Sequence, residues 1–413
     1  MFGVYNSLTS KNEKSIFFYP HTNCKNDGYD ILNGESDNVL CLFNSIIRDP
    51  KFKDYDLFVL YYHKERLDSY IKYCECYHRH VTFVYADESI NYFRNFAKCK
   101  YVFLDNSFDK LFYKSNKQNF VCLNYFGGLF KNEFFKWESN GGYKRMLKEQ
   151  HDMYKLYDYH LSISEICSKF IALDNCLYYP RFLNFGFPRN DIFFRDNTEL
   201  RNRIKAHVDF NVKHIITYVP THRDYENPSK TLYDKNKIKK NRTIFGDLTD
   251  TEKVLLETVL EETQTLIIAK VHPIQERACI NNEVSKHIIF YGDLIKSIKT
   301  SLNPLLSISD FMITDYTTAV YDFLYTGRPI IYYFYDYTEY KDSRGFFINP
   351  IQSICAGHIS YNISELVDAI RDLSNLSDPY RNKRQFIQEL FIKHLDGNST
   401  ERIKDYFFPN TKK

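Results

Sequence analysis

Short apolar runs alternate with longer amphipathic stretches through the first half of the chain. Stretches such as VLCLFNSIIRD and ERLDSYIKYCECY have helical length and separate these runs. The runs are rich in Ile, Val, Phe and Tyr and bounded by polar residues; they are SIFFYPH (15–21), DLFVLYYH (56–63), VTFVYA (81–86), YVFLDNS (101–107) and FVCLNYF (120–126). Strands separated by helices predict βαβ units and a parallel sheet. We therefore expect an α/β domain here.

The same pattern begins again from residue 211, and the segment 195–245 around this point is charged and Lys/Asn-rich. Its apolar runs are KHIITYVP, TLIIAKVHP, HIIFYG, FMITDYTT and PIIYYFYD. The pattern predicts two α/β domains, at 1–185 and 186–380. Residues 381–413 contain two helical stretches broken at Asp396-Gly397, which we expect to pack back on the first domain. Two facing Rossmann-like domains with a cleft between them and a C-terminal helix crossing back predict the glycosyltransferase-B architecture.

Composition narrows the classes of protein. Lys and Arg number 55 against 52 Asp and Glu, a net charge of +3 that argues against a dedicated nucleic-acid binder. The start of the chain lacks the apolar core of a signal peptide, and no apolar run reaches membrane-spanning length, so we expect a cytoplasmic protein. The ten cysteines show no framework spacing. The Cys74 to His80 cluster lacks the C-x2-C spacing of zinc sites, and we expect no metal there.

Polar side chains follow the apolar strands of the second half. In open parallel sheets, ligands bind at the carboxyl ends of the strands, where backbone groups and helix N-termini are free. Four strand ends therefore converge on one candidate site; they are Pro220-Thr221-His222-Arg223-Asp224, Lys270-Val271-His272-Pro273, Asp315-Tyr316-Thr317-Thr318 and Tyr335-Asp336.

Thr317 and Thr318 stand where one of these strands turns into a helix. Their hydroxyls and free amides are suited to a phosphate, although a Thr at this position also caps a helix for purely structural reasons. The nearby basic residues Arg223, Lys270, His272 and Arg328 favour a diphosphate. His272 is a candidate donor-phosphate contact or proton donor, with a structural histidine as the alternative. The chain contains neither a P-loop nor a G-x-G-x-x-G motif after a strand.

In order and spacing, several segments resemble the CDP-glycerol glycerophosphotransferase family, which includes teichoic acid primases and polymerases and related capsule polymerases. The resemblance covers about residues 95–375, and its segments are YVFLDNS, GFPRNDIFF, IITYVPTHRDYE, AKVHP, ISDFMITDYTTAVYDF and GRPIIYYFYDYTEYKDSRGFFIN. It implies a C-terminal domain that binds CDP-linked glycerol or ribitol and an N-terminal domain that presents an acceptor. The implied reaction transfers a polyol phosphate to a hydroxyl of a polymer or lipid-linked primer and releases CMP.

The resemblance also implies which residues form the site. Its donor site would consist of Thr221, Arg223, Lys270, His272, Thr317, Thr318 and Asp322, of which His272 and Arg223 are expected to be catalytic. From their positions near the strand ends, we expect Asp315 and Arg328 to bind substrate as well. Cationic groups and a helix N-terminus stabilise the charge of phosphoryl transfer, so no cofactor is obligatory. The alternative is a Mg²⁺ ion held by Asp315.

The acceptor side departs from the family. The family block Trp-His-Gly-Thr-Pro-Leu-Lys, whose histidine is regarded as the general base, corresponds here to Asn124–Lys131. Gly127 and Lys131 persist and are expected to bind substrate, but Phe126 replaces the histidine and cannot accept a proton. Three explanations follow: a substitute histidine, His160 or His151; a different acceptor, with the base supplied by the substrate or by a carboxylate such as Asp105; or loss of activity.

The leading hypothesis is a transferase of cell-surface polymer synthesis, in teichoic acid or capsule formation, at the cytoplasmic face of the membrane. The alternatives are a nucleotide-sugar glycosyltransferase of the same architecture and a catalytically silent donor-binding homologue. The expected partners are a CDP-polyol and a polymer or lipid-linked acceptor, with no nucleic acid. Peripheral membrane contact through the aromatic segment 134–146 and an oligomer, as in some relatives, both stay open.

Overall fold

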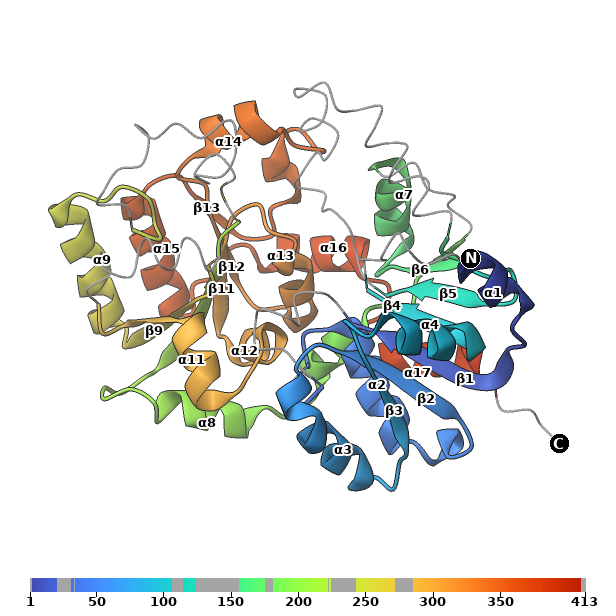
Figure 1. Ribbon diagram of the computed structural model, residues 1–413. Coiled ribbons are helices and arrows are strands. Elements are labelled where there is room, and N and C mark those ends of the chain that lie inside the picture. Colours follow the sequence, from blue (N-terminus) through green and yellow to red (C-terminus); the bar gives the residue numbers. More distant parts are fainter. Residues whose placement is uncertain are drawn as a thin grey trace. The chain divides into compact units, whose positions relative to one another are not determined.

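The computed structural model describes residues 2–20, 31–32, 34–105, 114–123, 156–174, 181–221, 223, 243–271 and 285–409. These residues divide into two compact α/β units (Figure 1). The first unit holds the described residues up to 123, those from 156 to 195 and those from 391 onward. The second unit holds the described residues from 196 to 390.

A seven-stranded parallel sheet forms the centre of the first unit, in the order β3-β2-β1-β4-β5-β6-β7. The strands are β1 Asn12–Tyr19, β2 Asp56–Tyr61, β3 Val81–Tyr85, β4 Cys99–Leu104, β5 Asn119–Cys122, β6 Tyr159–Leu161 and β7 Phe182–Leu183. The helices are α1 Phe2–Leu8, α2 Asn38–Arg48, α3 Leu67–Glu75, α4 Ser89–Lys98, α7 Glu165–Asp174 and α17 Ser399–Phe407, with the 3-10 helix η5 Pro188–Phe194.

Helices cover both faces of this sheet because neighbouring apolar residues point to opposite sides. Phe17 packs edge-on against Phe96 of α4, with ring centroids 5.6 Å apart. Phe18 packs in the same way against Phe43 of α2 at 5.2 Å. The continuous apolar runs of the sequence are therefore strands buried on both faces.

The second unit contains a six-stranded parallel sheet in the order β10-β9-β8-β11-β12-β13. Its strands are β8 His214–Val219, β9 Thr265–Ala269, β10 Ile288–Phe290, β11 Phe311–Thr314, β12 Ile330–Tyr333 and β13 His358–Ser360. Its helices are α8 Thr198–Lys205, α9 Asp250–Glu262, α11 Tyr291–Ile298, α12 Leu302–Ile308, α13 Ala319–Phe323, α14 Tyr337–Arg344, α15 Ile363–Ser374 and α16 Arg381–Phe391, the last of which ends in the first unit.

The two sheets share one strand order when each is numbered from its own first strand. In both, the order is 3-2-1-4-5-6, which β7 extends in the first unit. In each sheet the second and third strands are added on one side of the first strand, and the later strands are added on its other side. The switch point therefore lies between β1 and β4 in the first unit and between β8 and β11 in the second. Ligands of open α/β sheets bind at the carboxyl ends of strands at such switch points. This topology therefore marks the ends of β8 and β11 as the place to look for the donor site.

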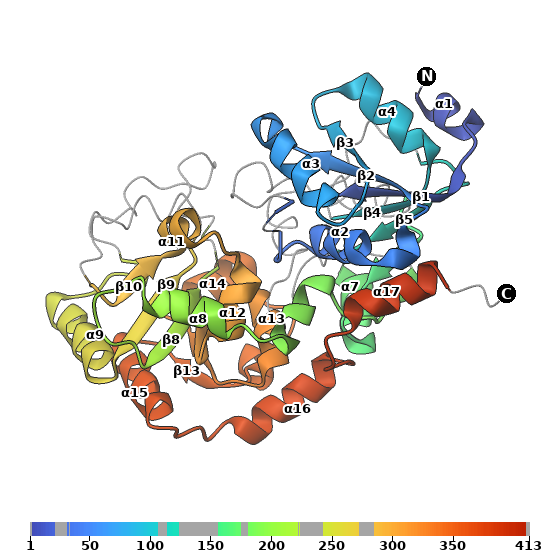
Figure 2. The same cartoon turned by 90° about the horizontal axis from the view of Figure 1, so that it is seen from below.

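The C-terminal helix returns to the first unit, as predicted. The Asp191 carboxylate of η5 accepts hydrogen bonds from the backbone N–H groups of Ser399 and Thr400, both at 2.9 Å. Lys404 of α17 pairs with Asp49 at 2.8 Å. Figure 2 shows α17 beside α2. In this division η5 belongs to the first unit, whereas the sequence pattern placed residues from 186 in the second domain.

The α/β class, the two Rossmann-like sheets and the returning helix are confirmed. Among the described residues, no helix combines the length and apolar character needed to cross a bilayer.

Candidate functional site

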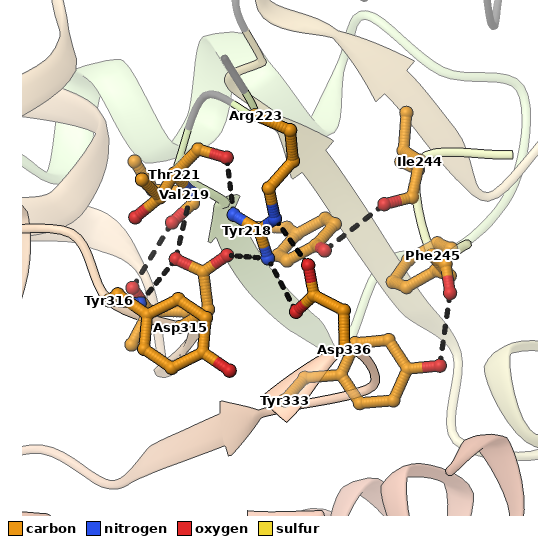
Figure 3. Close-up of polar contacts among 11 residues, drawn as sticks. Tyr218, Val219, Thr221, Arg223, Ile244, Phe245, Asp315, Tyr316, Tyr333 and Asp336 are labelled. Atoms are coloured by element: carbon orange, nitrogen blue, oxygen red, sulfur yellow. Dashed lines mark hydrogen bonds and ion pairs between the residues drawn. The ribbon is translucent and has the colours of Figure 1, made fainter. Parts of the chain in front are cut away.

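A buried ion triad joins three strand ends of the second sheet (Figure 3). Arg223 follows β8, Asp315 follows β11 and Asp336 follows β12. The Arg223 guanidinium donates to Asp336 through Nε at 2.6 Å and through Nη2 at 3.0 Å. Its Nη2 also lies 2.8 Å from Oδ2 of Asp315. The three side chains are between 0% and 4% exposed, so the arrangement is fixed inside the unit.

The same groups fix the turn at the switch point. Oδ1 of Asp315 accepts hydrogen bonds from the backbone N–H groups of Thr221, at 2.8 Å, and of Tyr316. Arg223 Nη1 donates to the Thr221 carbonyl. The hydroxyl of Thr314 donates to the Val219 carbonyl at 3.1 Å. Hydrogen bonds given by both segments therefore hold the residues after β8 against those after β11.

Aromatic rings enclose the triad. The guanidinium carbon of Arg223 lies 5.2 to 5.5 Å from the ring centroids of Tyr316, Tyr335 and Tyr340. Burial alone would lower the pKa of Arg223, but the adjacent Asp315 carboxylate, together with Asp336, holds this pKa well above its ordinary value. Arg223 stays charged, and its charge is matched by two carboxylates.

The triad changes the interpretation of Arg223. A guanidinium that is 1% exposed and held by two carboxylates acts through the groups it positions. Its predicted direct contact with the donor stays a prediction. The same contacts bear on the predicted Mg²⁺ alternative, because the Asp315 carboxylate already binds Arg223 and two backbone N–H groups. This arrangement does not favour a Mg²⁺ ion at Asp315.

Two buried hydroxyls at this edge lack a hydrogen-bond partner among the described residues. They belong to Thr221, which is 5% exposed, and to Tyr316, which is 0% exposed. An unsatisfied buried hydroxyl costs about 1–3 kcal/mol, and such groups in native proteins call for an explanation. A ligand oxygen at the switch point would satisfy the Thr221 hydroxyl.

Thr317, Thr318 and Asp322 lie at the start of α13 and within it. Thr317 Oγ1 accepts a hydrogen bond from the Ala319 N–H at 3.4 Å, whereas the Thr318 side chain makes no capping hydrogen bond. Both threonines are half-buried, and Asp322 is buried. The structural role of a capping Thr thus belongs to Thr317, and a phosphate contact by either residue stays a prediction.

Lys270 lies at the same sheet edge. It follows β9, and its backbone N–H donates to the Tyr218 carbonyl at 2.8 Å. Its ammonium lies 5.6 Å from the ring centroid of Tyr291. The predicted catalytic residue His272 lies outside the described residues, as do the acceptor-side residues Gly127 and Lys131.

Arg328 does not join the strand-end group, and that expectation is corrected. It precedes β12, and its Nη1 donates to the Ser307 and Ser309 carbonyls at 2.7 and 2.8 Å, where α12 leads into β11. This is the amino edge of the sheet, roughly 10 Å from the carboxyl edge along strands that rise about 3.3 Å per residue. A donor-binding role for Arg328 is not supported by this position.

Sequence reasoning placed Asp336 at a strand end of the candidate site but gave it no role there. The strand-end pattern contains Tyr335-Asp336, but no sequence feature pairs Asp336 with an arginine 113 positions away. A usable signal existed, because an isolated carboxylate after an apolar strand needs a cationic partner when it is buried.

The two described candidates for an acceptor-side base differ in environment. His160 of β6 is 5% exposed and stacks on Phe182, with ring centroids 5.2 Å apart. Burial, with a smaller effect from Arg181, lowers the pKa of His160 to about 4. Asp105 directly follows β4, at the switch point of the first sheet, and its N–H donates to the Tyr19 carbonyl at 3.0 Å. Phe126 and His151 lie outside the described residues.

A family model described as CDP-glycerol:poly(glycerophosphate) glycerophosphotransferase matches residues 30–409. The chain belongs to this family. Among its curated relatives, the teichoic acid glycerol-phosphate primase of Bacillus subtilis (strain 168) is 26% identical over 285 residues. That match covers 65% of this chain and 66% of the relative. The teichoic acid glycerol-phosphate transferase of Staphylococcus aureus is 28% identical over 232 residues, 55% of this chain and 54% of the relative. The match thus spans just under two thirds of the first of these relatives and about half of the second.

Solved structures share the fold of this glycerophosphotransferase family member. The wall teichoic acid polymerase TagF superposes with a TM-score of 0.69 at 17% identity, covering 96% of this chain and 89% of that chain. A TagF variant soaked with CDPG gives a TM-score of 0.74 at 16% identity, covering 98% and 91%. At these identities the likeness establishes the fold alone.

Proposed function

We propose that the chain transfers a polyol phosphate, glycerol phosphate or ribitol phosphate, from a CDP-linked donor to a hydroxyl of a cell-surface polymer or lipid-linked primer. The observation that carries this proposal is the edge at the β8/β11 switch point, where the buried Thr221 hydroxyl lies beside the Asp315–Arg223–Asp336 triad. Membership of the family supports the donor class.

The proposed reaction is a phosphoryl-group substitution. The acceptor oxygen forms a bond to the phosphorus nearest the polyol, and the bond from that phosphorus to the bridging oxygen of CMP breaks. The acceptor proton goes to a base, and CMP leaves with the bridging oxygen. The transition state spreads negative charge over the phosphoryl oxygens, so catalysis consists of positioning and charge stabilisation.

Thr221, Lys270 and Arg223 have different roles in the proposed reaction. The Thr221 hydroxyl donates to a phosphate oxygen, and the Lys270 ammonium supplies positive charge at the same sheet edge. Arg223 positions Thr221 through its carbonyl and through Asp315. Because the triad has two carboxylates for one guanidinium, it contributes no net positive charge. The cations must therefore come from Lys270 and from residues such as His272.

We assign the proton acceptor on the acceptor side to Asp105 as part of this proposal. Phe126 cannot accept a proton, and the His160 ring lies within β6 between Tyr157 and Phe182 rather than at a strand end. Asp105 follows β4 at the first switch point. Asp105→Asn should lower kcat about 100- to 10,000-fold, and His160→Gln should leave kcat within a few-fold of wild type. A large loss of kcat in His160→Gln with little change in Asp105→Asn would assign the proton acceptor to His160 instead.

Ligand-induced changes in melting temperature test the donor class without requiring turnover. A ligand that binds the native state raises the melting temperature. CDP-glycerol or CDP-ribitol should do so, and Thr221→Val should weaken the effect. Stabilisation by UDP-sugars but by neither CDP-polyol would favour the nucleotide-sugar alternative. Activity that appears only in Phe126→His would identify the chain as a silent homologue.

The proposal places the reaction at the inner face of the cell membrane, because a lipid-linked primer is fixed there. Contact with that membrane would be peripheral. The aromatic segment 134–146, which the sequence suggests for such contact, lies outside the described residues.

A further inference from the structure

A cavity of about 360 Å³ lies in the first unit, beside α2. Cys41, Asn44, Ser45 and Arg48 line it and recur every three or four positions, so they form one face of the helix. The 3-10 helix η5 and helix α17 supply further lining residues. The volume falls at the small end of ligand pockets, which measure about 300–1,000 Å³.

The described lining of this cavity is predominantly cationic. It contains Arg48, Arg189, Arg195 and Lys404 against Glu35 and Asp49. Lys404 and Asp49 pair with one another at 2.8 Å. The other charged lining residues are three arginines and Glu35. The nearby carboxylates of Asp37 and Asp191 do not line the cavity and accept hydrogen bonds from backbone N–H groups of α2 and α17. Burial raises the pKa of the Cys41 thiol, so this side chain adds no negative charge.

Contacts hold two of these guanidinium groups in place. Arg48 Nη2 donates to the Tyr73 hydroxyl at 2.8 Å, and that hydroxyl donates to Asn44 Oδ1 at 3.1 Å. The guanidinium carbon of Arg189 lies 5.5 Å from the ring centroid of Phe187. Guanidinium groups held by neighbours lose less side-chain freedom when they bind an anion.

Asn38 links the cavity to the acceptor block. Its side chain is fully buried, and Oδ1 accepts a hydrogen bond from the Arg189 N–H at 3.2 Å. Its Nδ2 donates to the carbonyl of Leu123 at 2.8 Å. Leu123 directly precedes Asn124–Lys131, the block that the sequence assigns to the acceptor. From Cys41 to Arg48 the helix extends about 10 Å at 1.5 Å per residue, in the direction away from Asn38.

We propose that this cavity binds phosphodiester groups of the acceptor chain, at repeats behind the hydroxyl that is extended. The identity of the acceptor rests on the proposed function. Guanidinium groups recognise phosphate oxygens in a bidentate way. A polyol-phosphate chain carries one negative charge per repeat and engages several such groups, whereas a neutral glycan lacks the charges that this lining matches.

The direct test is binding of fluorescent poly(glycerol phosphate) oligomers to the full chain, without donor, by anisotropy. The double variant Arg48→Gln/Arg195→Gln removes two exposed guanidinium groups from the lining. It should weaken oligomer binding about tenfold or more, with a shallower dependence on salt. Arg94→Gln/Arg371→Gln removes the same charge from α4 and α15, outside the cavity, and should change binding by no more than about twofold. Ser45→Asp, which adds a negative charge to the lining, should reproduce the loss.

Acceptor length supplies the kinetic test. In the pocket variants the KM for long oligomers should rise, while kcat and the KM for the CDP-polyol stay at wild-type values. An acceptor with one phosphate should show no difference. Equal binding and equal KM in wild type and pocket variants would overturn the proposal.

The remaining controls separate the pocket from other sources of phosphate and from the proposed function. Loss of binding to phosphatidylglycerol vesicles in the pocket variants, with oligomer binding intact, would overturn the proposal in favour of a lipid headgroup. Pocket-dependent binding of inorganic phosphate, with oligomers bound equally by all variants, would also overturn it. If the wild type binds oligomers through the pocket but releases no CMP, the pocket stands and the proposed function fails.

Discussion

Arg223 is the residue whose surroundings most change its interpretation. Residue type and position at a strand end suggested a phosphate contact, but Asp315 and Asp336 enclose its guanidinium. The residue types near a sheet edge can be predicted from sequence. Which of them neutralise one another cannot, because Arg223 and Asp336 are 113 positions apart and meet only through the strand order β8-β11-β12.

Arg223→Gln should destabilise the protein by about 3–5 kcal/mol, because it leaves two buried carboxylates without their cation. Chemical denaturation measures this free energy. Arg371→Gln, which breaks a half-exposed pair with Glu262, should cost about 0–1 kcal/mol. An Arg223→Gln protein of wild-type stability that no longer binds donor would instead show that Arg223 contacts the donor directly.

Thr221→Val separates binding from stability. It removes a buried hydroxyl that has no partner among the described residues, so stability should stay equal or rise. Donor affinity should fall about tenfold through loss of a hydrogen bond to a charged oxygen.

The matched control for this variant is Thr217→Val in β8. The Thr217 hydroxyl is buried and bonded to Ser309 Oγ at 2.6 Å. Its loss should cost about 1 kcal/mol of stability and leave donor affinity unchanged. A loss of stability in Thr221→Val with unchanged donor affinity would contradict the proposed role of Thr221.

At the scale of elements, strands were easier to predict than the partners of their flanking residues. Continuous apolar runs such as those of β8 and β9 are typical of parallel strands buried on both faces. Arg328 was misplaced because its nearness to β12 in sequence was taken for nearness to the carboxyl edge, although it precedes that strand. The placement of η5 depends on the Asp191 contacts with α17, which local sequence does not indicate.

Strand β6 should make the stability of the first unit sensitive to acid. Burial lowers the pKa of His160 from 6.5 to about 4. Between these values the unfolded chain binds the proton more readily than the folded chain, so stability falls as pH falls through this window. The loss should reach about 3 kcal/mol near pH 4. Unfolding free energies of wild type and His160→Phe from pH 7 to pH 4 measure it. A variant with the wild-type slope would contradict this account.

At the scale of the molecule, the two units carry related topologies with different chemistry. In the second unit, Thr221 and Asp315 lie at the switch point of the sheet. In the first unit, Asp105 lies at the corresponding position, and a cavity lined by cationic residues lies beside α2. The sequence predicted the two sheets and the donor-side strand ends from apolar runs. It did not predict the cavity, because Arg48, Arg189 and Lys404 come from α2, η5 and α17, which are far apart in sequence and meet only in the folded unit.

The central claim is that a polyol phosphate moves from a CDP-polyol to an acceptor hydroxyl. The most direct measurement follows CMP release and label transfer together, with CDP-glycerol and CDP-ribitol radiolabelled in the polyol and with oligomeric or lipid-linked acceptors. We predict that label enters the acceptor in equal amounts to the CMP released, and that both fall in Thr221→Val. Absence of CMP release with either donor from folded wild-type protein would contradict the account.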